Sequence, residues 1–97
     1  MPNLVITGAN RGLGLEFVRR YLDLGWRIIA LNRGTSPGIE ALAGNDLLTV
    51  LRGDLTDSKT LGELVADTRE ALAGEAIDLL INNAGVMGTN TFHEGGM

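Results

Sequence analysis

A glycine-rich segment between an apolar strand and an amphipathic helix constrains this chain more than any other feature. Residues 7–14 read TGANRGLG, and we predict a strand over Asn3–Thr7 before them and a helix over Leu13–Leu24 after them. Such a turn directs free backbone N–H groups and the positive end of the helix dipole toward one point. Its glycines let the backbone approach an anion closely. The segment therefore predicts a phosphate or pyrophosphate site.

The spacing of these glycines excludes two common phosphate-binding motifs. Three residues separate Gly8 from Gly12 and Leu13 follows, whereas a P-loop has four residues between its glycines and then a lysine. The fingerprint GxGxxG is absent as well, because the spacing here is GxxxGxG. The alternative is a glycine-rich turn that only connects strand and helix, but the flanking elements favour the phosphate site.

The rest of the chain alternates strand-like and helix-like stretches. Short apolar runs predict strands over Asn3–Thr7, Arg27–Asn32, Leu47–Arg52 and Ile77–Asn82. Residues Ile39–Ala43 allow at most a short helix, whereas helical spacing predicts a longer one over Lys59–Ala73, with Asp57 or Ser58 as its N-cap. Strands joined by helical crossovers are parallel, and their apolar sequences favour a sheet covered on both faces. We therefore predict an α/β fold with helices on both faces of a parallel sheet.

The two longer helices are expected to bury apolar stripes. The first helix has two of them, Leu15, Val18 and Leu22 in one and Phe17, Tyr21 and Leu24 in the other. Its solvent stripe comprises Glu16, Arg19, Arg20 and Asp23. The apolar face of the helix predicted over Lys59–Ala73 comprises Leu61, Leu64, Val65, Thr68 and Leu72.

Composition narrows the function classes. A chain of 97 residues suffices for one small domain, and its net charge of −4 argues against a nucleic-acid binder, which usually carries a basic face. The absence of cysteine excludes disulfides and thiolate metal sites, and we expect a cytoplasmic protein. The longest unbroken apolar run, Ile28–Leu31, is too short to span a membrane. His93-Glu94 begins like the zinc motif HExxH, but Met97 stands where the second histidine belongs.

The end of the second strand predicts the choice of cofactor. NAD-binding α/β folds usually place an acidic residue there to hold the ribose 2′-hydroxyl, but this chain has Asn32 and then Arg33. A guanidinium pairs with a 2′-phosphate, and Arg11 in the neighbouring turn converges on the same group. We therefore predict NADP(H) rather than NAD(H). The alternative is that both arginines are solvated surface residues.

Two further segments follow predicted strands. Asp54 comes just after the third strand, where its carboxylate either accepts from the adenine amino group or caps the turn, and the residues alone do not decide between these. Asn82-Asn83-Ala84-Gly85 ends the fourth strand, at the edge of the sheet where ligands bind in such folds. The alternative for this second segment is an ordinary Asn/Gly turn.

Together these segments resemble the short-chain dehydrogenase/reductase family. Thr7–Gly14 looks like its TGxxxGxG motif, Asp54 like its adenine-contacting aspartate, and Asn82–Gly85 like its NNAG motif. The order and separation of the three also fit. Within the family, Asn3–Leu22 looks most like the C-factor-like and sniffer-like carbonyl reductases.

The resemblance implies a Rossmann-like fold with strand order 3-2-1-4. It covers about residues 1–88, which we expect to form an NADP-binding domain, with residues 89–97 as an irregular tail. This corresponds only to the N-terminal part of the family fold, so the predicted sheet of about four strands is incomplete relative to it.

The resemblance also implies the cofactor contacts and the reaction. The cofactor-binding residues would be Gly8, Asn10, Arg11, Gly12, Leu13, Arg33, Asp54, Leu55, Asn82, Ala84 and Gly85. Gly14 would serve helix packing. The family reaction is hydride transfer between NADP(H) and a carbonyl or alcohol.

The catalytic residues of the family have no counterpart here. Its proton donor is the tyrosine of YxxxK, but the only tyrosine is Tyr21, in the first helix, with Gly25 at the lysine position. The only lysine is Lys59, and Ser36 and Ser58 lie in early turns. We therefore predict no catalytic residue and no turnover by these 97 residues.

Three functional interpretations remain open. The chain is the N-terminal part of an NADP-dependent carbonyl reductase, a non-catalytic NADP-binding or partner module, or a remnant without ligand. We prefer the first, because Thr89–Met97 starts no new element. In each, Ile77–Asn82 would be an exposed apolar edge, through which we expect weak stability and self-association.

Overall fold

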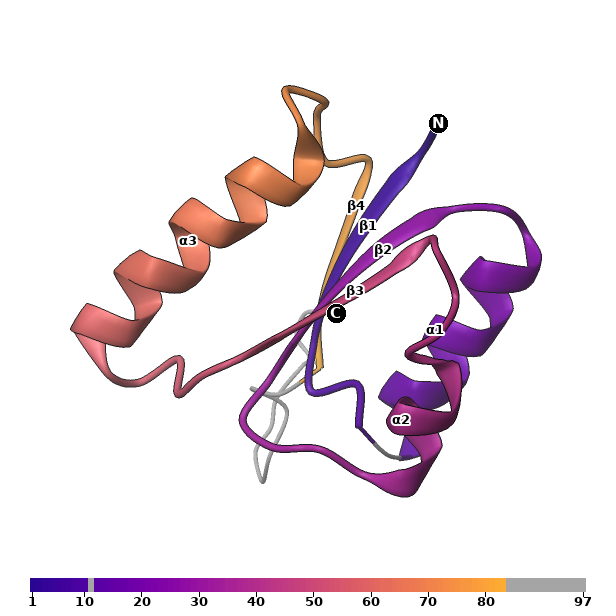
Figure 1. Cartoon of the computed structure of the whole chain (residues 1–97), viewed down its shortest axis with the longest axis horizontal. Helices are drawn as coiled ribbons and strands as arrows, with labels where there is room; N and C mark the ends of the chain where they lie inside the picture. Colours follow the sequence, from indigo (N-terminus) through magenta and orange to yellow (C-terminus); the bar gives the residue numbers. More distant parts are fainter. Residues whose placement is uncertain (11, 84–97) are drawn as a thin grey trace, which may run out of the picture.

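The computed structural model describes residues 1–10 and 12–83, which form a parallel sheet between helices (Figure 1). The elements are β1 (Asn3–Thr7), α1 (Gly12–Asp23), β2 (Arg27–Asn32), α2 (Pro37–Leu42), β3 (Leu48–Arg52), α3 (Ser58–Leu72) and β4 (Leu79–Asn82). The strand order is β3-β2-β1-β4, and every neighbouring pair is parallel. The predicted fold class and strand order are therefore confirmed.

All four strands end at the same edge of the sheet. The register pairs Thr7 with Asn82 across β1 and β4, and Asn32 with Arg52 across β2 and β3. The chain runs outward from β1 in one direction through β2 and β3, and returns to the other side of β1 with β4. Ligands of open α/β sheets bind beside the strand ends where the strand order reverses, which here is beside β1.

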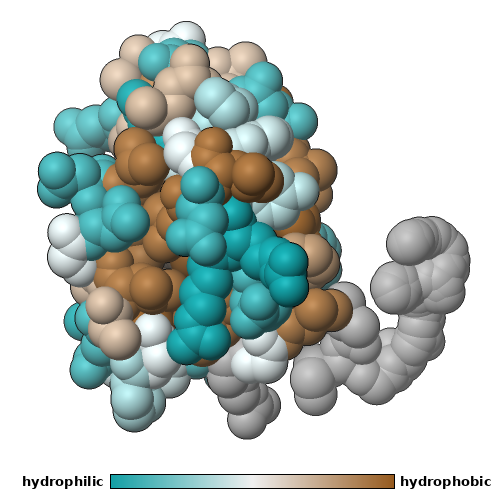
Figure 2. Space-filling view, turned by 90° about the vertical axis from the view of Figure 1, so that its right-hand side faces the viewer, coloured by the Kyte–Doolittle hydropathy of each residue, from teal (hydrophilic) through white to brown (hydrophobic). Residues whose placement is uncertain are grey.

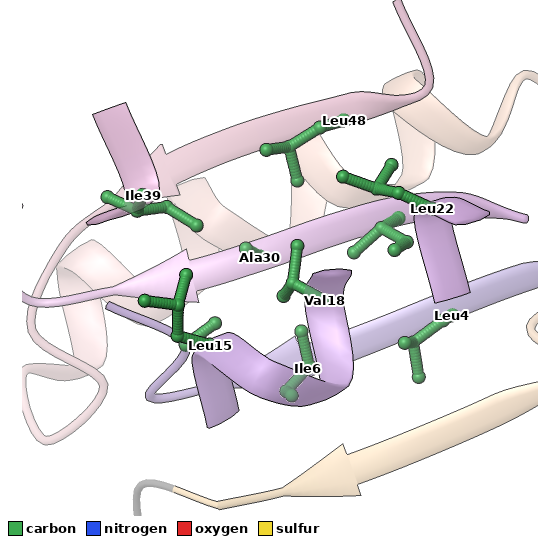
Figure 3. Close-up of a cluster of buried hydrophobic side chains, with 10 residues drawn as sticks. Leu4, Ile6, Leu15, Val18, Leu22, Ala30, Ile39 and Leu48 are labelled. Atoms are coloured by element: carbon green, nitrogen blue, oxygen red, sulfur yellow. The ribbon is translucent and has the colours of Figure 1, made fainter. Parts of the chain in front are cut away.

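One face of the sheet is covered by α1 and α2, which lie together on the right in Figure 1. The stripe of Leu15, Val18 and Leu22 is buried, as predicted. These side chains meet Leu4, Ile6, Ala30, Ile39 and Leu48 from the sheet and α2 (Figure 3). Figure 2 views this side and shows a hydrophilic band running between apolar regions. The residues of the predicted solvent stripe of α1 are all exposed.

The second predicted stripe of α1 is only partly correct. Phe17 and Tyr21 are half-buried against the core, but Leu24 is 69% exposed. The helix ends at Asp23, so Leu24 lies in the turn toward β2 and no longer follows the helical spacing that placed it in the stripe. The apolar contact of α1 is therefore narrower at its C-terminal end than the sequence predicts.

Within residues 1–83 as the structure describes them, α3 is the helix that covers the opposite face, on the left in Figure 1. Leu72 packs with Val5 and Ile29, and Leu64 and Thr68 are buried, but Leu61 and Val65 are exposed. The prediction of one uniformly buried face on this helix is therefore wrong in part. The reason is that α3 lies mainly on β2 and β3 and leaves the flank toward β4 open.

The predicted strand over Ile77–Asn82 is shorter in the structure, because β4 begins at Leu79. The main-chain N–H of Asp78 donates to the Asn3 carbonyl at 2.9 Å. The Asp78 carboxylate accepts from the Asn3 N–H at 2.8 Å, so a side chain replaces the carbonyl that a longer strand would supply.

The helix starts are set by caps. Asp57 accepts from the Lys59 N–H at 3.1 Å and caps α3, as predicted. The short helix begins at Pro37 rather than Ile39, because Ser36 accepts from the Ile39 N–H and Pro37 occupies the first turn. The longest helix, α3, has 15 residues, and no helix within residues 12–83 is long and apolar enough to cross a membrane.

Candidate functional site

An open cleft of about 650 Å³ lies at the edge of the sheet where the strands end. Its walls come from the loops after β1, β2 and β3, from the end of β2 and from Asn82 at the end of β4. The lining residues are Gly8, Asn10, Leu31, Arg33, Thr35, Ser36, Asp54, Leu55, Thr56 and Asn82. The cleft thus lies beside β1, at the position expected for a ligand of this sheet type.

The glycine-rich turn forms one end of the cleft. Gly8 and Gly12 have φ angles of +70° and +59°, a backbone region that glycine occupies without cost. A Cβ on Gly14 would lie 2.2 Å from the Gly8 carbonyl oxygen, which is backbone, and 2.8 Å from Asn83 Nδ2. The turn can follow this path only with a glycine at position 14, which gives Gly14 the expected role in helix packing.

The end of β4 is tied to the glycine-rich turn by two asparagine side chains. Thr7 Oγ1 donates to Asn82 Oδ1 at 2.9 Å, and Asn83 Nδ2 donates to the Gly8 carbonyl at 2.8 Å. Each bond joins residues 75 positions apart. Asn83 was not predicted as a site residue, although the two adjacent asparagines at a strand end were the available signal.

Asn32, at the end of β2, is also part of the turn's support. It is buried, and its Oδ1 accepts from the Ala9 N–H at 2.8 Å. Its Nδ2 has no hydrogen-bond partner among the described residues. The side chain that occupies the usual acidic position therefore faces the glycine-rich turn and supplies no carboxylate to the cleft.

A second support comes from the loop before α2. The Ser36 hydroxyl donates to the Asn10 carbonyl and also accepts from the Ile39 N–H at 3.3 Å. Ser36 thereby connects the glycine-rich turn to α2. Thr35 and Ser36 both line the cleft beside Arg33.

Arg33 and Asp54 face each other across the cleft. Arg33 Nη2 lies 3.9 Å from Asp54 Oδ2, and the two side chains are 77% and 42% exposed. An ion pair this long and this exposed contributes little to stability. The Arg33 guanidinium is therefore free to exchange its carboxylate partner for another anion.

The two oxygens of Asp54 have different environments. Oδ1 accepts from the Thr56 hydroxyl at 2.6 Å and from the Thr56 N–H at 2.9 Å, whereas Oδ2 faces Arg33. The Thr56 hydroxyl, then the Thr56 N–H and then the charge of Arg33 hold the pKa of Asp54 below its ordinary value. Asp54 does cap its turn, as one of the two interpretations predicted, and it uses only one oxygen to do so.

The structure brings most of the predicted site residues together. Gly8, Asn10, Arg33, Asp54, Leu55 and Asn82 line the cleft. Gly12 and Leu13 begin α1 and are exposed, but they do not line it. Arg11, Ala84 and Gly85 lie outside the described residues. Four further residues line the cleft that were not predicted from the sequence, Leu31, Thr35, Ser36 and Thr56.

Comparison with known proteins identifies one family and several relatives of this chain. The family model described as short chain dehydrogenase matches residues 2–96. The short chain dehydrogenase virK of Hypocrea virens is 38% identical over 89 residues, which are 87% of this chain and 32% of that protein. The chain spans about a third of the length of the curated relatives that it matches.

Solved structures with the same fold include two carbonyl reductases. The NADPH-bound carbonyl reductase from chicken fatty liver has a TM-score of 0.77 and 28% identity, and the match covers 100% of this chain and 39% of that one. The Sniffer protein of Caenorhabditis elegans, named as a carbonyl reductase, has a TM-score of 0.75 and 33% identity, with coverage of 100% and 43%. A 4-hydroxyisoleucine dehydrogenase complexed with NADH has a TM-score of 0.68 and 26% identity, with coverage of 82% and 32%.

Proposed function

Because this chain belongs to the short-chain dehydrogenase family, we propose that it forms the NADP(H)-binding part of an oxidoreductase acting on a carbonyl or alcohol. The observation that carries the proposal is the cleft at the strand ends. It brings the glycine-rich turn, a solvent-facing guanidinium and an ionised carboxylate to one place. These are the groups that a phosphorylated dinucleotide needs for its diphosphate, its 2′-phosphate and its adenine.

The residues of the cleft fit such a cofactor. The diphosphate would lie against the turn that contains Gly8, Asn10, Arg11, Gly12 and Leu13, since the first N–H groups of α1 have no partners inside the helix. Placement of the helix so close to β1 depends on the missing side chain at position 14. The cofactor, when bound, supplies or accepts the hydride.

The adenosine part of the cofactor would occupy the other end of the cleft. Asp54 and Leu55 would contact the adenine, and Asn82, Ala84 and Gly85 the ribose side. This division assigns the residues after β3 to the base, and Asn82 at the end of β4 together with the residues that follow it in sequence to the sugar.

Arg33 is the basis for proposing NADP(H) over NAD(H). Its guanidinium lines the cleft and is paired only at 3.9 Å, so a 2′-phosphate can replace Asp54 as its partner. The residue before it, Asn32, is buried and bonded to Ala9, so no acidic side chain stands at the end of β2 to receive a ribose hydroxyl. Both features favour the phosphorylated cofactor.

We propose further that these 97 residues bind the cofactor without reducing a carbonyl themselves. Tyr21, the only tyrosine, packs edge-on against Trp26 with 4.9 Å between ring centroids and does not line the cleft. Ser36 uses its hydroxyl to join Asn10 and the start of α2. The preparation should therefore show no NADPH oxidation that depends on an added aldehyde or ketone.

The proposed cofactor preference is tested by calorimetric titration with NADPH and with NADH. Trp26 is a poor reporter of cofactor binding. It lies just before the start of β2, whereas the cleft lies where the strands end. Replacing Arg33→Ala removes one charge-assisted pair, so NADPH binding should weaken by about 1–3 kcal/mol while NADH binding changes little.

The matched control is Arg52→Ala, an exposed arginine at the end of β3 that does not line the cleft. It should leave both affinities unchanged. An equal loss for both cofactors in the Arg33 variant would refute its assignment to the 2′-phosphate. No binding of either cofactor by the unaltered chain would refute the proposed function itself.

A further inference from the structure

The turn between β3 and α3 gives Thr56 an unusual place beside the cleft. Thr56 lines the cleft, and both its hydroxyl and its main-chain N–H are directed to the same oxygen, Oδ1 of Asp54. The Asp57 N–H closes the turn by donating to the Asp54 carbonyl at 3.1 Å. One residue thus fixes the orientation of the carboxylate without contacting its other oxygen.

We propose that Thr56 is a positioning residue for adenine recognition: it holds Oδ1 of Asp54 so that Oδ2 accepts from the adenine amino group. This inference rests on the proposed function. It concerns a residue that acts on the cofactor indirectly, by orienting the Asp54 carboxylate.

The geometry assigns the roles of donor and acceptor. A distance of 2.6 Å between the Thr56 hydroxyl and a carboxylate oxygen is typical of a charge-assisted hydrogen bond. The hydroxyl proton is therefore committed to Asp54 and is not available to a ligand. Among the described residues, by contrast, Asp54 Oδ2 faces only the guanidinium of Arg33 at 3.9 Å, which a 2′-phosphate would draw away.

The charges around Asp54 are consistent with this role. Arg33 faces it from the loop after β2, and Asp57, on the other side, caps the start of α3. The Asp57 carboxylate is occupied by the Lys59 N–H at 3.1 Å and the Thr60 hydroxyl at 3.2 Å. Asp54 is therefore the carboxylate of this turn that keeps an oxygen for the cleft.

The test compares Thr56→Val, which keeps the shape of the side chain and loses the hydroxyl, with Thr56→Ser, which keeps the hydroxyl. The probes are NADPH and an NADPH analogue whose purine lacks the 6-amino group, both titrated by calorimetry. Thr56→Val should weaken NADPH binding about three- to tenfold, as expected for one net hydrogen bond, and weaken binding of the analogue less than twofold. Thr56→Ser should restore NADPH binding.

A measurement without ligand separates positioning from a direct contact. Carboxyl carbon chemical shifts of Asp54, followed against pH by NMR, should show a higher pKa in Thr56→Val and an unchanged pKa in Thr56→Ser, because the hydroxyl bond stabilises the ionised form. Selective loss of NADPH binding without a change in that pKa would assign Thr56 a direct contact with the base and overturn the proposal.

The remaining outcomes are also decisive. Equal weakening for NADPH and the analogue would reduce Thr56 to a structural part of the turn and overturn the inference alone. No effect of Thr56→Val on either probe would do the same. No binding of NADPH by the unaltered chain would overturn the proposed function and, with it, the inference.

Discussion

At the scale of single residues, Gly14 is where α1 approaches the turn after β1 too closely to leave room for a side chain. The nearest atom to a Cβ at this position would be the Gly8 carbonyl oxygen at 2.2 Å, and backbone cannot turn aside as a flexible side chain can. Substitution must therefore displace either the helix or the glycine-rich turn. The residue links local chain geometry directly to the shape of the cleft.

We predict that Gly14→Ala lowers the free energy of unfolding. Overpacking costs about 1–3 kcal/mol, which exceeds the gain of about 1 kcal/mol that alanine brings to a helix interior. The control is Gly62→Ala in α3, where a Cβ would meet no atom within 4 Å and the same propensity gain should stabilise the chain. Urea denaturation measures both, and a stabilising Gly14→Ala would contradict the contact described here.

Arg33 and Asp54 were easier to predict as residues of the cleft than the side chains that hold its turn in place. Arg33 and Asp54 follow strands, and strand ends meet at one edge, so their convergence could be expected. The bonds of Asn32 to Ala9 and of Asn83 to Gly8 could not, because they join residues 23 and 75 positions apart. Their existence depends on the exact path of the turn, which no local pattern encodes.

At the scale of elements, charged and polar side chains hold the sheet and α3 together at the end where the strands begin, away from the cleft. Arg27, at the start of β2, donates to the carbonyls of Ala71 and Leu72 at 3.3 and 3.1 Å and so satisfies the C-terminal end of α3. Its Nη2 lies 3.7 Å from Glu75, which also accepts from the Asn3 side chain at 3.0 Å. Three elements are thus joined where α3 ends and the chain turns toward β4.

We predict that this junction is sensitive to acid. The Asn3 side chain, and then the charge of Arg27, hold the pKa of Glu75 below its ordinary value of 4.5. Because the pKa is lowered in the folded state, the stabilisation is present above pH 4.5 and is lost as the pH falls through the folded pKa. Urea midpoints between pH 7 and about pH 3 should show the parent chain losing its advantage over Glu75→Gln.

The control for this pH series is Glu63→Gln on the exposed side of α3. Its difference from the parent chain should stay small throughout the series. A stability difference between the parent and Glu75→Gln that does not change with pH would show that Glu75 contributes nothing through its charge.

The element boundaries show where local rules succeed and fail. Ser36 followed by Pro37 is a recognisable helix start, so the first residue of α2 could have been predicted from the sequence. The late start of β4 was not, since it depends on Asp78 bonding to Asn3 in another strand. Non-local hydrogen bonds move boundaries that periodicity alone places one or two residues away.

At the scale of the whole molecule, the two edges of the sheet and its two faces are unequally covered. On the α1 and α2 side the core is continuous from β1 to β3. On the α3 side the cover stops before β4, whose Leu80 is 61% exposed and lies beside Val5 in the register. The apolar composition of the strands predicted a sheet covered on both faces, and for β4 that prediction is wrong within the described residues.

This uncovered flank continues onto the helix. A shallow apolar groove of about 260 Å³ lies between α3, Leu31 of β2 and Ile77, which precedes β4. Three exposed side chains line it, those of Leu61, Val65 and Ile77. The outer edge of β4 has no neighbouring strand among the described residues, so its backbone groups offer a place for another chain to pair.

We therefore predict that the 97-residue chain associates with copies of itself through β4 and the adjoining side of α3. Light scattering should give a mass above 10.3 kDa that rises with concentration, and Leu80→Lys should shift it toward the monomer, because a charge cannot be buried there without a partner. Leu24→Lys is the matched control, since Leu24 is a comparably exposed leucine in the turn after α1, the helix that covers the opposite face of the sheet from α3. A monodisperse monomer with a cooperative melt, or an equal response to both substitutions, would show that this flank does not act as an interface.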